Sequence, residues 1–356
     1  MAGIQKIMSK VQVALLFGGV SAEHEVSCLS AASVLNHLDR SRYEVTVIGI
    51  DRNGRWYRQL QELLPLPAVK ADGSQLVSVI PGVGLAVAGE TLLVDVAFLV
   101  THGTQGEDGR LQGLLDCAAV RYTGSGVAGS ALGMDKDFAK QIWQQQGFPV
   151  VPWLTAHRDR ESSPEACSAL FARCSTTLGL PLFVKPANSG SSVGVAKVTN
   201  GAEFGPAMDA AFAVDSKVMV EKAVNGREIE VAVLGVSQPE AFGPGEVVPN
   251  HEFYDYEAKY LDPHGAALEV PAQLAPEVSS RILELAVNAY RALDCLGFSR
   301  VDFFIDRSTG AISLNEINTL PGFTTISMFP RMVLHSGMTY PTLLDRLIDE
   351  ALRKPR

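Results

Sequence analysis

Short apolar runs alternate with a helical pattern over the first third of the chain. Val11–Phe17, Tyr43–Ile50 and Leu93–Val100 are apolar over most of their length and predict buried strands. Glu25–Leu38 predicts a helix between the first two strands. This alternation is typical of βαβ units, so we expect a parallel sheet with helices on both faces.

A second region begins near Arg121 and contains both kinds of pattern. A helix is expected over roughly Ala128–Gln146, and strands are expected over Pro181–Lys185 and Val195–Val198. Between these strands lies Ser189–Gly194, a run of small residues that predicts a loop. The region therefore has the composition of an α+β lobe.

The last region begins near Lys217 and is rich in strand patterns. Val218–Glu221, Glu228–Leu234 and Val301–Asp306 predict strands. The last two partly alternate between apolar and polar residues, which favours an antiparallel sheet with one covered face. Pro276–Asp294 carries an apolar stripe at helical spacing and predicts a helix.

The composition fits a globular chain of several domains. Of the 356 residues, 47% are hydrophobic and 19% are charged. We expect an α/β domain at residues 1–121 and two α+β lobes at residues 122–216 and 217–356. The net charge of −9 argues against a nucleic acid or an anionic membrane as partner. No apolar stretch approaches the roughly 18–20 residues of a membrane span.

The N-terminus and the cysteines favour a cytoplasmic protein. Lys6 and Lys10 precede an apolar run as in a signal peptide, but the run continues into Gly18-Gly19 without a small-residue cleavage pattern. A buried first strand explains the run better. The five cysteines form no C-x-x-C pair, so zinc and thioredoxin-type sites are disfavoured and reduced thiols are expected.

Two glycine-rich motifs fail their tests as nucleotide-binding fingerprints. Gly124–Gly129 matches G-x-G-x-x-G, but the acidic residue expected about 20 residues later is missing. Gly190–Gly194 is followed by Val195 and not by the Lys-Ser/Thr of a Walker A motif. A Rossmann dehydrogenase and a P-loop NTPase are therefore both disfavoured.

Lys185–Gly194 is a different kind of candidate for phosphate binding. A lysine at a strand end precedes a run of small residues. Unobstructed backbone N–H groups can cradle phosphate oxygens, and the lysine adds a positive charge. Taken alone, an ordinary glycine turn with a surface lysine explains this loop equally well.

Acidic and amide side chains near the C-terminus form the strongest constellation. If Asp306 pairs with Ile312 in a hairpin, Asp302 lies opposite Glu316, with the Cβ atoms about 4.5–5.5 Å apart. Two carboxylates so placed repel each other unless a cation lies between them, and with Asn318 they offer the oxygen ligands that suit Mg²⁺. A solvated polar face is the alternative, but these strands are otherwise rich in apolar residues.

Two further features lie close to this cluster. Arg300 precedes Asp302 on the same strand face and can stabilise negative charge on a transferring phosphoryl group or a tetrahedral centre. Neutralisation of Asp302 is the simpler reading of this arginine. Gly322 permits close backbone approach just before a helix expected near Thr324, whose N-terminus offers N–H donors to an anion.

Taken together, these stretches resemble the D-alanine–D-alanine ligases of the ATP-grasp superfamily over nearly the whole chain. The matching stretches are 18–27, 101–109, 122–126 with 134–136, 185–186 with 190–194, 253–260, 300–302 and 315–322. The resemblance implies a Rossmann-like N-terminal domain followed by a two-lobed ATP-grasp fold.

The resemblance also implies an activity. Enzymes of this family join two D-alanines with ATP for peptidoglycan synthesis. ATP phosphorylates the carboxylate of the first D-alanine, and the amine of the second attacks the acyl phosphate. Arg300 and the Gly322 N–H would stabilise the oxyanion of the tetrahedral intermediate. A cytoplasmic homodimer is the expected form.

A nucleotide and metal site follows from the same resemblance. Lys136 and Lys185 would grip the ATP phosphates beneath a lid at Ser191 and Ser192, and Lys259 would neutralise the transferring phosphate. The rest of the ATP site would comprise Glu221, Lys222, Ala223, Val224, Glu228, Phe304, Asn315 and Glu316. Two Mg²⁺ or Mn²⁺ ions would be bound by Asp302, Glu316 and Asn318.

The resemblance assigns the substrate residues as well. Glu23 would hold the ammonium of the first D-alanine, and His102 would lie near its carboxylate. Tyr260 would join Ser191 and Glu23 in a hydrogen-bonded chain that ties the lid over this substrate. The carboxylate of the second D-alanine would be held by Ser327 and Met328.

Three other functions stay open at this point. A D-alanine–D-lactate or D-alanine–D-serine ligase would differ in the loop that carries Tyr260, and the ending Glu-Ala-Lys-Tyr follows the D-alanine pattern. Another ATP-grasp carboxylate–amine ligase is a more distant alternative. A nucleotide-responsive binding protein without turnover would need fewer charged groups than this chain presents.

Overall fold

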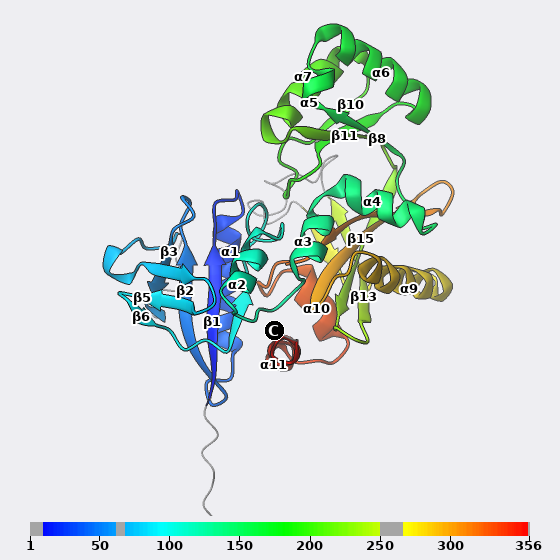
Figure 1. Cartoon of the computed structure of the whole chain (residues 1–356). Helices are drawn as coiled ribbons and strands as arrows, with labels where there is room; N and C mark the ends of the chain where they lie inside the picture. Colours follow the sequence, from blue (N-terminus) through cyan, green and yellow to red (C-terminus); the bar gives the residue numbers. More distant parts are fainter. Residues whose placement is uncertain (1–9, 62–67, 250–265, 355–356) are drawn as a thin grey trace, which may run out of the picture.

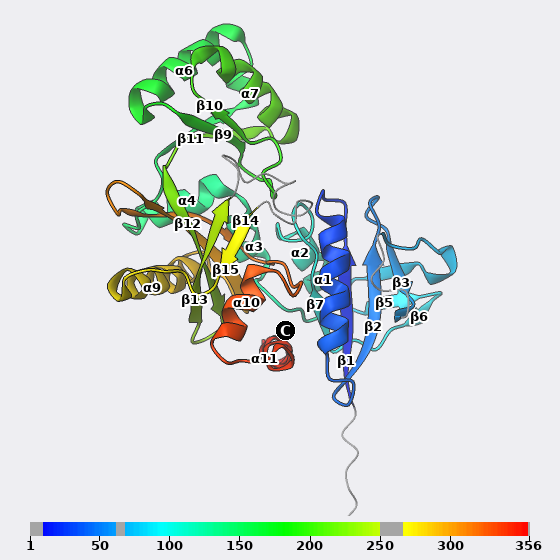
Figure 2. The same ribbon diagram turned by 180° about the vertical axis from the view of Figure 1, so that it is seen from behind.

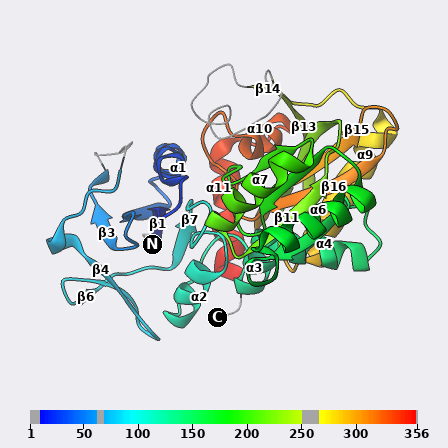
Figure 3. The same cartoon turned by 90° about the horizontal axis from the view of Figure 1, so that it is seen from above.

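The described residues form three parts, each built around a β-sheet. The computed structural model describes residues 10–61, 68–249 and 266–354. Figure 1 shows the N-terminal unit in blue to cyan, the middle lobe in green, and the C-terminal lobe in yellow-green to red. Seen from above, the middle lobe lies over the C-terminal lobe, and the N-terminal unit stands beside both (Figure 3).

The N-terminal unit contains the expected parallel strands. β1 (Val11–Gly18) pairs in parallel with β2 (Tyr43–Ile50) and with β7 (Val96–Leu99), and α1 (His24–His37) packs on β1. Several short strands were not predicted because each spans only two to four residues. They are β3 (Trp56–Gln59), antiparallel at the sheet edge, and the separate hairpin sheet of β4 (Val77–Ile80), β5 (Gly84–Val87) and β6 (Glu90–Thr91). A 3₁₀ turn, η2, spans Gly73–Gln75.

The helix expected over Ala128–Gln146 is two helices. α3 (Val127–Met134) and α4 (Lys136–Gln145) meet at Asp135, whose backbone is extended. The Asp135 carboxylate accepts the Phe138 N–H at 3.1 Å and so caps α4. A side-chain acceptor that satisfies the first amides of a new helix ends the preceding one. An earlier helix, α2 (Arg110–Cys117), contacts α3.

The middle lobe is an antiparallel sheet of order β10-β9-β11-β8. Its strands are β8 (Trp153–His157), β9 (Leu182–Pro186), β10 (Ala196–Val198) and β11 (Lys217–Lys222). Its helices are α5 (Arg158–Glu161), α6 (Pro164–Leu178) and α7 (Gly201–Val214). Since β11 pairs with both β8 and β9, this sheet extends beyond residue 216.

The C-terminal lobe is built on an antiparallel sheet of order β14-β13-β12-β15-β16, as the alternating strands predicted. The strands are β12 (Gly226–Leu234), β13 (Glu240–Pro249), β14 (Ala266–Glu269), β15 (Phe298–Asp306) and β16 (Ile312–Asn318). α9 (Pro276–Ala292) contacts β12, β13 and β15, and α4 packs against α9, where the Trp143 indole donates to the Ala289 carbonyl.

One hydrophobic core joins the two ends of the chain. α10 (Met328–His335) and α11 (Tyr340–Arg353) follow the C-terminal sheet, and α11 contacts both α1 and β7. Figure 2 shows α11 between the N-terminal unit and the C-terminal sheet. Leu15 and Phe98 belong to the same buried cluster as Phe329 and Leu347. Among the described helices, none has the length and apolarity to cross a membrane.

Candidate active site

A cavity of about 840 Å³ opens between the three parts. Its lining includes Glu23 of the N-terminal unit, Lys185 of the middle lobe and Arg300 of the C-terminal lobe. Every predicted site residue within the described ranges lines it. Lys259 and Tyr260, with the rest of the 253–260 stretch, lie outside the described residues.

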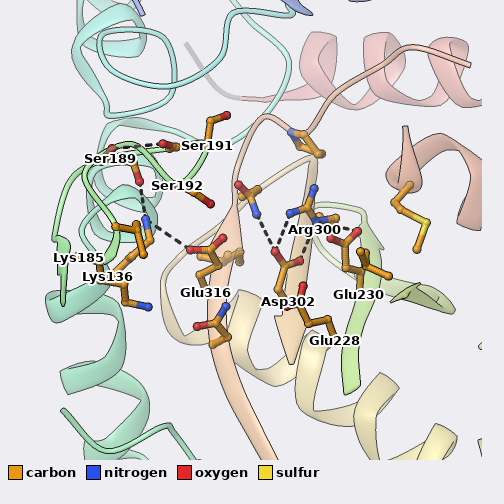
Figure 4. Close-up of a pocket in the computed structure, with 18 of the residues that line it drawn as sticks. Lys136, Lys185, Ser189, Ser191, Ser192, Glu228, Glu230, Arg300, Asp302 and Glu316 are labelled. Carbon is orange, nitrogen blue, oxygen red and sulfur yellow. Dashed lines mark hydrogen bonds and ion pairs between the residues drawn. The ribbon is translucent and has the colours of Figure 1, made fainter. Parts of the chain in front are cut away.

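Two lysines form the basic side of the cavity (Figure 4). Lys136, the first residue of α4, donates to the Ser189 carbonyl at 2.6 Å and lies 3.4 Å from a Glu316 carboxylate oxygen. Lys185 on β9 lies 2.5 Å from Glu221 on β11, the neighbouring strand. Both ammonium groups are therefore held at the cavity wall by protein oxygens, in positions from which they can attract an anion.

The small-residue loop reaches across to the N-terminal unit. The Ser191 hydroxyl donates to the Glu23 carboxylate at 2.6 Å. Ser191 and Ser192 both have left-handed backbones, with φ of 50° and 58°, which non-glycine residues rarely adopt. A Cβ atom at Gly190 would lie 2.8 Å from a Glu23 carboxylate oxygen, so a side chain there would require that carboxylate to move. The conformation of the loop therefore allows close contact with the Glu23 side chain.

The acidic cluster forms, although the hairpin differs from the expected one. The predicted pairing of Asp306 with Ile312 is wrong by one residue, because Ile305 takes that place. A bulge then shifts the register between β15 and β16, so Asp302 does face Glu316. The Asp306 carboxylate accepts backbone N–H groups of the turn and lengthens the loop.

Arg300 lies at the centre of this cluster. Its guanidinium donates to both Asp302 carboxylate oxygens, at 2.7 and 2.6 Å, and lies 3.2 Å from Glu230. Asn318, opposite Arg300 across the strand pair, donates its amide N–H to Asp302 at 3.1 Å. Figure 4 shows Arg300, Asp302 and Glu316 pointing into the same space. The bidentate fork fixes the direction of the arginine toward the cavity.

The oxygen donors of the cluster fit a hard cation. Two carboxylates, Asp302 and Glu316, and the amide oxygen of Asn318 are the type of ligands that Mg²⁺ prefers. In the described ranges, no three His, Cys, Asp or Glu side chains gather into a metal site on their own. A cation here would therefore take further ligands from phosphate oxygens or water, as Mg²⁺ does when it binds a nucleotide.

The remaining nucleotide candidates lie on β11 of the middle sheet, on β12, β15 and β16 of the C-terminal sheet, and on the segment between β11 and β12. Asn315, the bulge residue of β16, keeps a buried side-chain oxygen without a hydrogen-bond partner, which an incoming ligand can satisfy. The other candidates that line this part of the cavity are Glu221, Lys222, Ala223, Val224, Glu228 and Phe304.

The substrate candidates gather where the N-terminal unit meets the loop after β16. His102 contacts the Leu320 carbonyl through Nδ1 at 2.8 Å and the Ser30 hydroxyl through Nε2 at 3.3 Å. Burial lowers the pKa of His102, which favours the neutral ring. His102 thus connects the N-terminal unit to the segment before Gly322.

A side chain at Gly322 would require the Ser327 side chain to move. A Cβ atom there would lie 2.8 Å from the Ser327 hydroxyl oxygen, which in turn accepts the Thr324 N–H at 3.1 Å. Met328, the first residue of α10, lines the same part of the cavity. The backbone of this turn therefore stays close to whatever the cavity binds.

Sequence reasoning missed two buried ionisable residues, one in the cavity wall and one directly behind it. Glu107 lies in the quoted 101–109 stretch but received no role; burial, and then the nearby Glu23, raise its pKa to about 8. Lys140 is fully buried and contacts Glu221. Its position four residues after Lys136, on one helix face, was the available signal.

Comparison with family profiles covers most of the chain. Residues 12–125 match the family described as "D-ala D-ala ligase N-terminus", and residues 142–349 match "D-ala D-ala ligase C-terminus". The chain is 43% identical to a D-alanine–D-alanine ligase of Treponema denticola, with 96% of each chain covered. It is 46% identical to a D-alanine–D-alanine ligase A of Bradyrhizobium diazoefficiens, covering 98% of this chain and 96% of the relative.

Solved structures give the same result for the fold. The D-alanine–D-alanine ligase of Coxiella burnetii aligns with a TM-score of 0.83 at 36% identity, covering 97% of this chain and 94% of that one. The VanG D-Ala:D-Ser ligase of Enterococcus faecalis aligns with a TM-score of 0.85 at 35% identity, covering 96% and 100%. The expected Rossmann-like and ATP-grasp architecture is confirmed, and the chain belongs to the D-alanine–D-alanine ligase family.

Proposed function

We propose that this protein joins two D-alanine molecules into D-alanyl-D-alanine at the expense of ATP. One observation carries the proposal: a single cavity brings two lysines, an acidic pair and an arginine together from all three parts of the chain. This is the set of charges that phosphoryl transfer followed by amine attack requires. The D-alanine–D-alanine ligases of similar sequence perform the reaction in their name.

The nucleotide binds on the Lys136 and Lys185 side. These lysines hold the phosphates, and the loop at Ser191 and Ser192 closes over them. Glu221 and the backbone of residues 222–224 (Lys222, Ala223 and Val224) contact the adenine, and Glu228 contacts the ribose. Phe304, Asn315 and Glu316 complete the ATP site. Lys259, which lies outside the described residues, neutralises the transferring phosphate in this proposal.

The side chains that would hold Mg²⁺ or Mn²⁺ are those of Asp302, Glu316 and Asn318. Their oxygen donors fit such ions, and a divalent ion supplies charge neutralisation of the phosphate oxygens when bound. Lys136, 3.4 Å from Glu316, adds a fixed positive charge beside it. The divalent ion and Lys136 would thus together neutralise the negative charge of the two carboxylates.

The chemistry proceeds in two substitutions. Glu23 holds the ammonium of the first D-alanine, and His102 lies near its carboxylate, an oxygen of which attacks the γ-phosphorus while ADP leaves. The free amine of the second D-alanine, held at its carboxylate by Ser327 and Met328, attacks the acyl carbon of the acyl phosphate. Phosphate then leaves with the C–O electron pair, and the amine loses its proton.

Two groups stabilise the oxyanion of the tetrahedral intermediate that forms when the amine attacks the acyl phosphate. The Arg300 guanidinium and the Gly322 N–H are placed at the cavity wall, one fixed by Asp302 and the other by the turn around Ser327. Donors held before reaction need no reorganisation as charge develops. Tyr260 completes the chain that begins with Ser191 and Glu23.

The proposed setting is the cytoplasm, where the dipeptide supplies peptidoglycan synthesis, and the proposed assembly is a homodimer. Both rest on the family, and the described cysteines, none in a disulfide, agree with a reducing compartment. We propose domain boundaries near residues 121 and 216. β11 follows the second boundary in sequence but belongs to the sheet of the middle lobe.

Phosphate release tests the proposal. The purified protein is given ATP and Mg²⁺ with D-alanine, L-alanine, D-serine, or D-alanine plus D-lactate, and the products are identified by mass. We expect phosphate release in the two assays that contain D-alanine, with D-alanyl-D-alanine as the main product of both. Preferential formation of the D-serine or D-lactate product would instead assign the related ligase activity, and no release with any of them would reject a ligase.

A further inference from the structure

Lys140 is a buried cation directly behind the proposed nucleotide site. It lies on α4, and its side chain has no exposed surface. Its ammonium contacts the Glu221 carboxylate and lies 3.4 Å from the Val151 carbonyl and 5.8 Å from the Trp153 ring centre. Glu221 and Val151 line the cavity, so Lys140 reaches the site only through them.

Glu221 bridges two lysines with its two oxygens. Oε1 contacts Lys140, and Oε2 lies 2.5 Å from Lys185. The Lys185 side chain is 11% exposed and lines the cavity, whereas Glu221 is almost wholly buried. The three groups together carry a net charge of one positive unit, and the cation that faces the cavity is Lys185.

The position of Lys140 determines how much of the positive charge of Lys185 is available to a bound phosphate group. A buried carboxylate is stabilised by every cation in contact with it. With Lys140 present, Glu221 shares its charge between two partners. Without Lys140, Glu221 would pair with Lys185 alone, and the pair would present no net charge to a phosphate group.

We propose that Lys140 is a positioning residue for the nucleotide: it neutralises Glu221 from behind, so that Lys185 keeps its positive charge for the phosphates. This inference rests on the proposed function, since it needs a nucleotide in this cavity. Lys140 touches neither the substrates nor the reacting atoms, and its effect is confined to nucleotide affinity.

The test compares Lys140→Met with a matched control, Lys217→Met. Lys217 is also nearly buried beside α4, but it pairs with Asp135 and Asp137, which do not line the cavity. We measure the Kd of ADP by calorimetry and the KM values of ATP and D-alanine. Lys140→Met should raise the Kd of ADP and the KM of ATP on the order of ten-fold and leave the KM of D-alanine unchanged, whereas Lys217→Met leaves all three within about two-fold.

A double variant keeps the test valid if Lys140→Met fails to fold. Lys140→Met with Glu221→Gln removes both buried charges and frees Lys185 again. We expect the double variant to bind ADP about as well as Glu221→Gln alone, because Lys140 acts through Glu221. Additive losses in the double variant, or unchanged ADP binding by folded Lys140→Met, would overturn the inference. Failure of the wild-type chain to bind ADP would reject the proposed nucleotide site itself.

Discussion

Burial sets the charge of single side chains in this cavity. Glu107 is 7% exposed, and the Gly103 and Leu320 amides hydrogen-bond to its carboxylate. Burial and the neighbouring Glu23 outweigh these bonds and raise its pKa. Glu23 has the Ser191 hydroxyl as a donor and stands at the cavity wall. Two carboxyl groups in one pocket thus differ in role because their surroundings differ.

Glu107 predicts a pH-dependent stability. Its pKa is raised from 4.5 to about 8 in the folded chain, so between these values the folded state keeps a proton that the unfolded state releases. The unfolding free energy contributed by this group therefore falls as pH rises through that window, by at most about 1.4 kcal/mol per pH unit. Denaturant titrations at pH 5 to 8 should show this fall in the wild type and a flatter profile in Glu107→Gln. Parallel profiles for both proteins would contradict it.

We expect a substitution of Glu316 to lower turnover without affecting the stability of the fold. Glu316→Gln keeps the size of the side chain but removes a charge that faces Asp302 and Lys136. We expect Mg²⁺-dependent phosphate release to fall by about 100-fold or more. Thermal unfolding should change little, because the side chain packs against polar groups. Turnover near the wild-type rate would remove Glu316 from the metal site.

At the scale of elements, two irregularities shape the site. The bulge in β16 places Asp302 opposite Glu316 and leaves Asn315 unpaired with a buried side-chain oxygen. The Ser189–Gly194 loop contains two serines with left-handed backbones and meets Glu23 of the N-terminal unit. Strained backbone that persists at a site is held by its contacts, which here are Ser191 to Glu23 and Lys136 to Ser189.

The loop makes a prediction about Gly190. A Cβ atom there would come within 2.8 Å of the Glu23 carboxylate, so Gly190→Ala should displace that carboxylate or the loop and weaken the contact between them. We expect an increase of about ten-fold or more in the KM of D-alanine with little change in stability. Steady-state kinetics and thermal unfolding measure the two effects. Gly205→Ala in α7, where a Cβ atom meets nothing within 4 Å, serves as control and should leave kinetics unchanged.

The same loop should gain order when a nucleotide binds. Closure over an acyl phosphate excludes water from an intermediate that hydrolyses readily. Hydrogen exchange at residues 189–194 should slow with a non-hydrolysable ATP analogue, while exchange in the buried β1 strand stays constant. Equal exchange of the loop with and without the analogue would count against a lid.

At the scale of the whole molecule, the ends of the chain share one core. α11 packs against α1 and β7, and Leu347 belongs to the same buried cluster as Leu15. His102 reinforces this contact through its bond to the Leu320 carbonyl. The N-terminal unit and the C-terminal lobe therefore support one wall of the cavity together.

Because the core is shared, we expect a destabilising substitution in α11 to destabilise the N-terminal unit as well. Leu347→Ala removes buried methyl groups and should lower the unfolding free energy by about 2–5 kcal/mol. Because the core is common, hydrogen exchange should accelerate in β7 of the N-terminal unit as well as in α11. Exposed Leu334→Ala, in α10, is the matched control. Acceleration confined to α11 would show that the two parts unfold separately.

Much of the fold followed from periodicity alone. Tyr43–Ile50 has the predicted bounds, and the five-stranded sheet is antiparallel as the alternation of Glu228–Leu234 and Val301–Asp306 indicated. Where the expected single helix over Ala128–Gln146 proved to be two, a local polar contact decided the outcome. The Asp135 side chain caps a new helix inside an otherwise continuous helical pattern, and apolar spacing does not report such a cap.

The sequence by itself determined the chemical groups of this site, because motif residues such as Lys185, Arg300 and Asp302 lie close to recognisable strand ends and turns. Only the tertiary structure decided which of them meet. Glu23 and Ser191 are 168 positions apart, yet they share a hydrogen bond. Lys140 is a buried residue of α4, and its charge affects the site only because β11 places Glu221 in contact with it. Periodicity reports which face of an element is buried, whereas contact between distant elements depends on packing that no local pattern encodes.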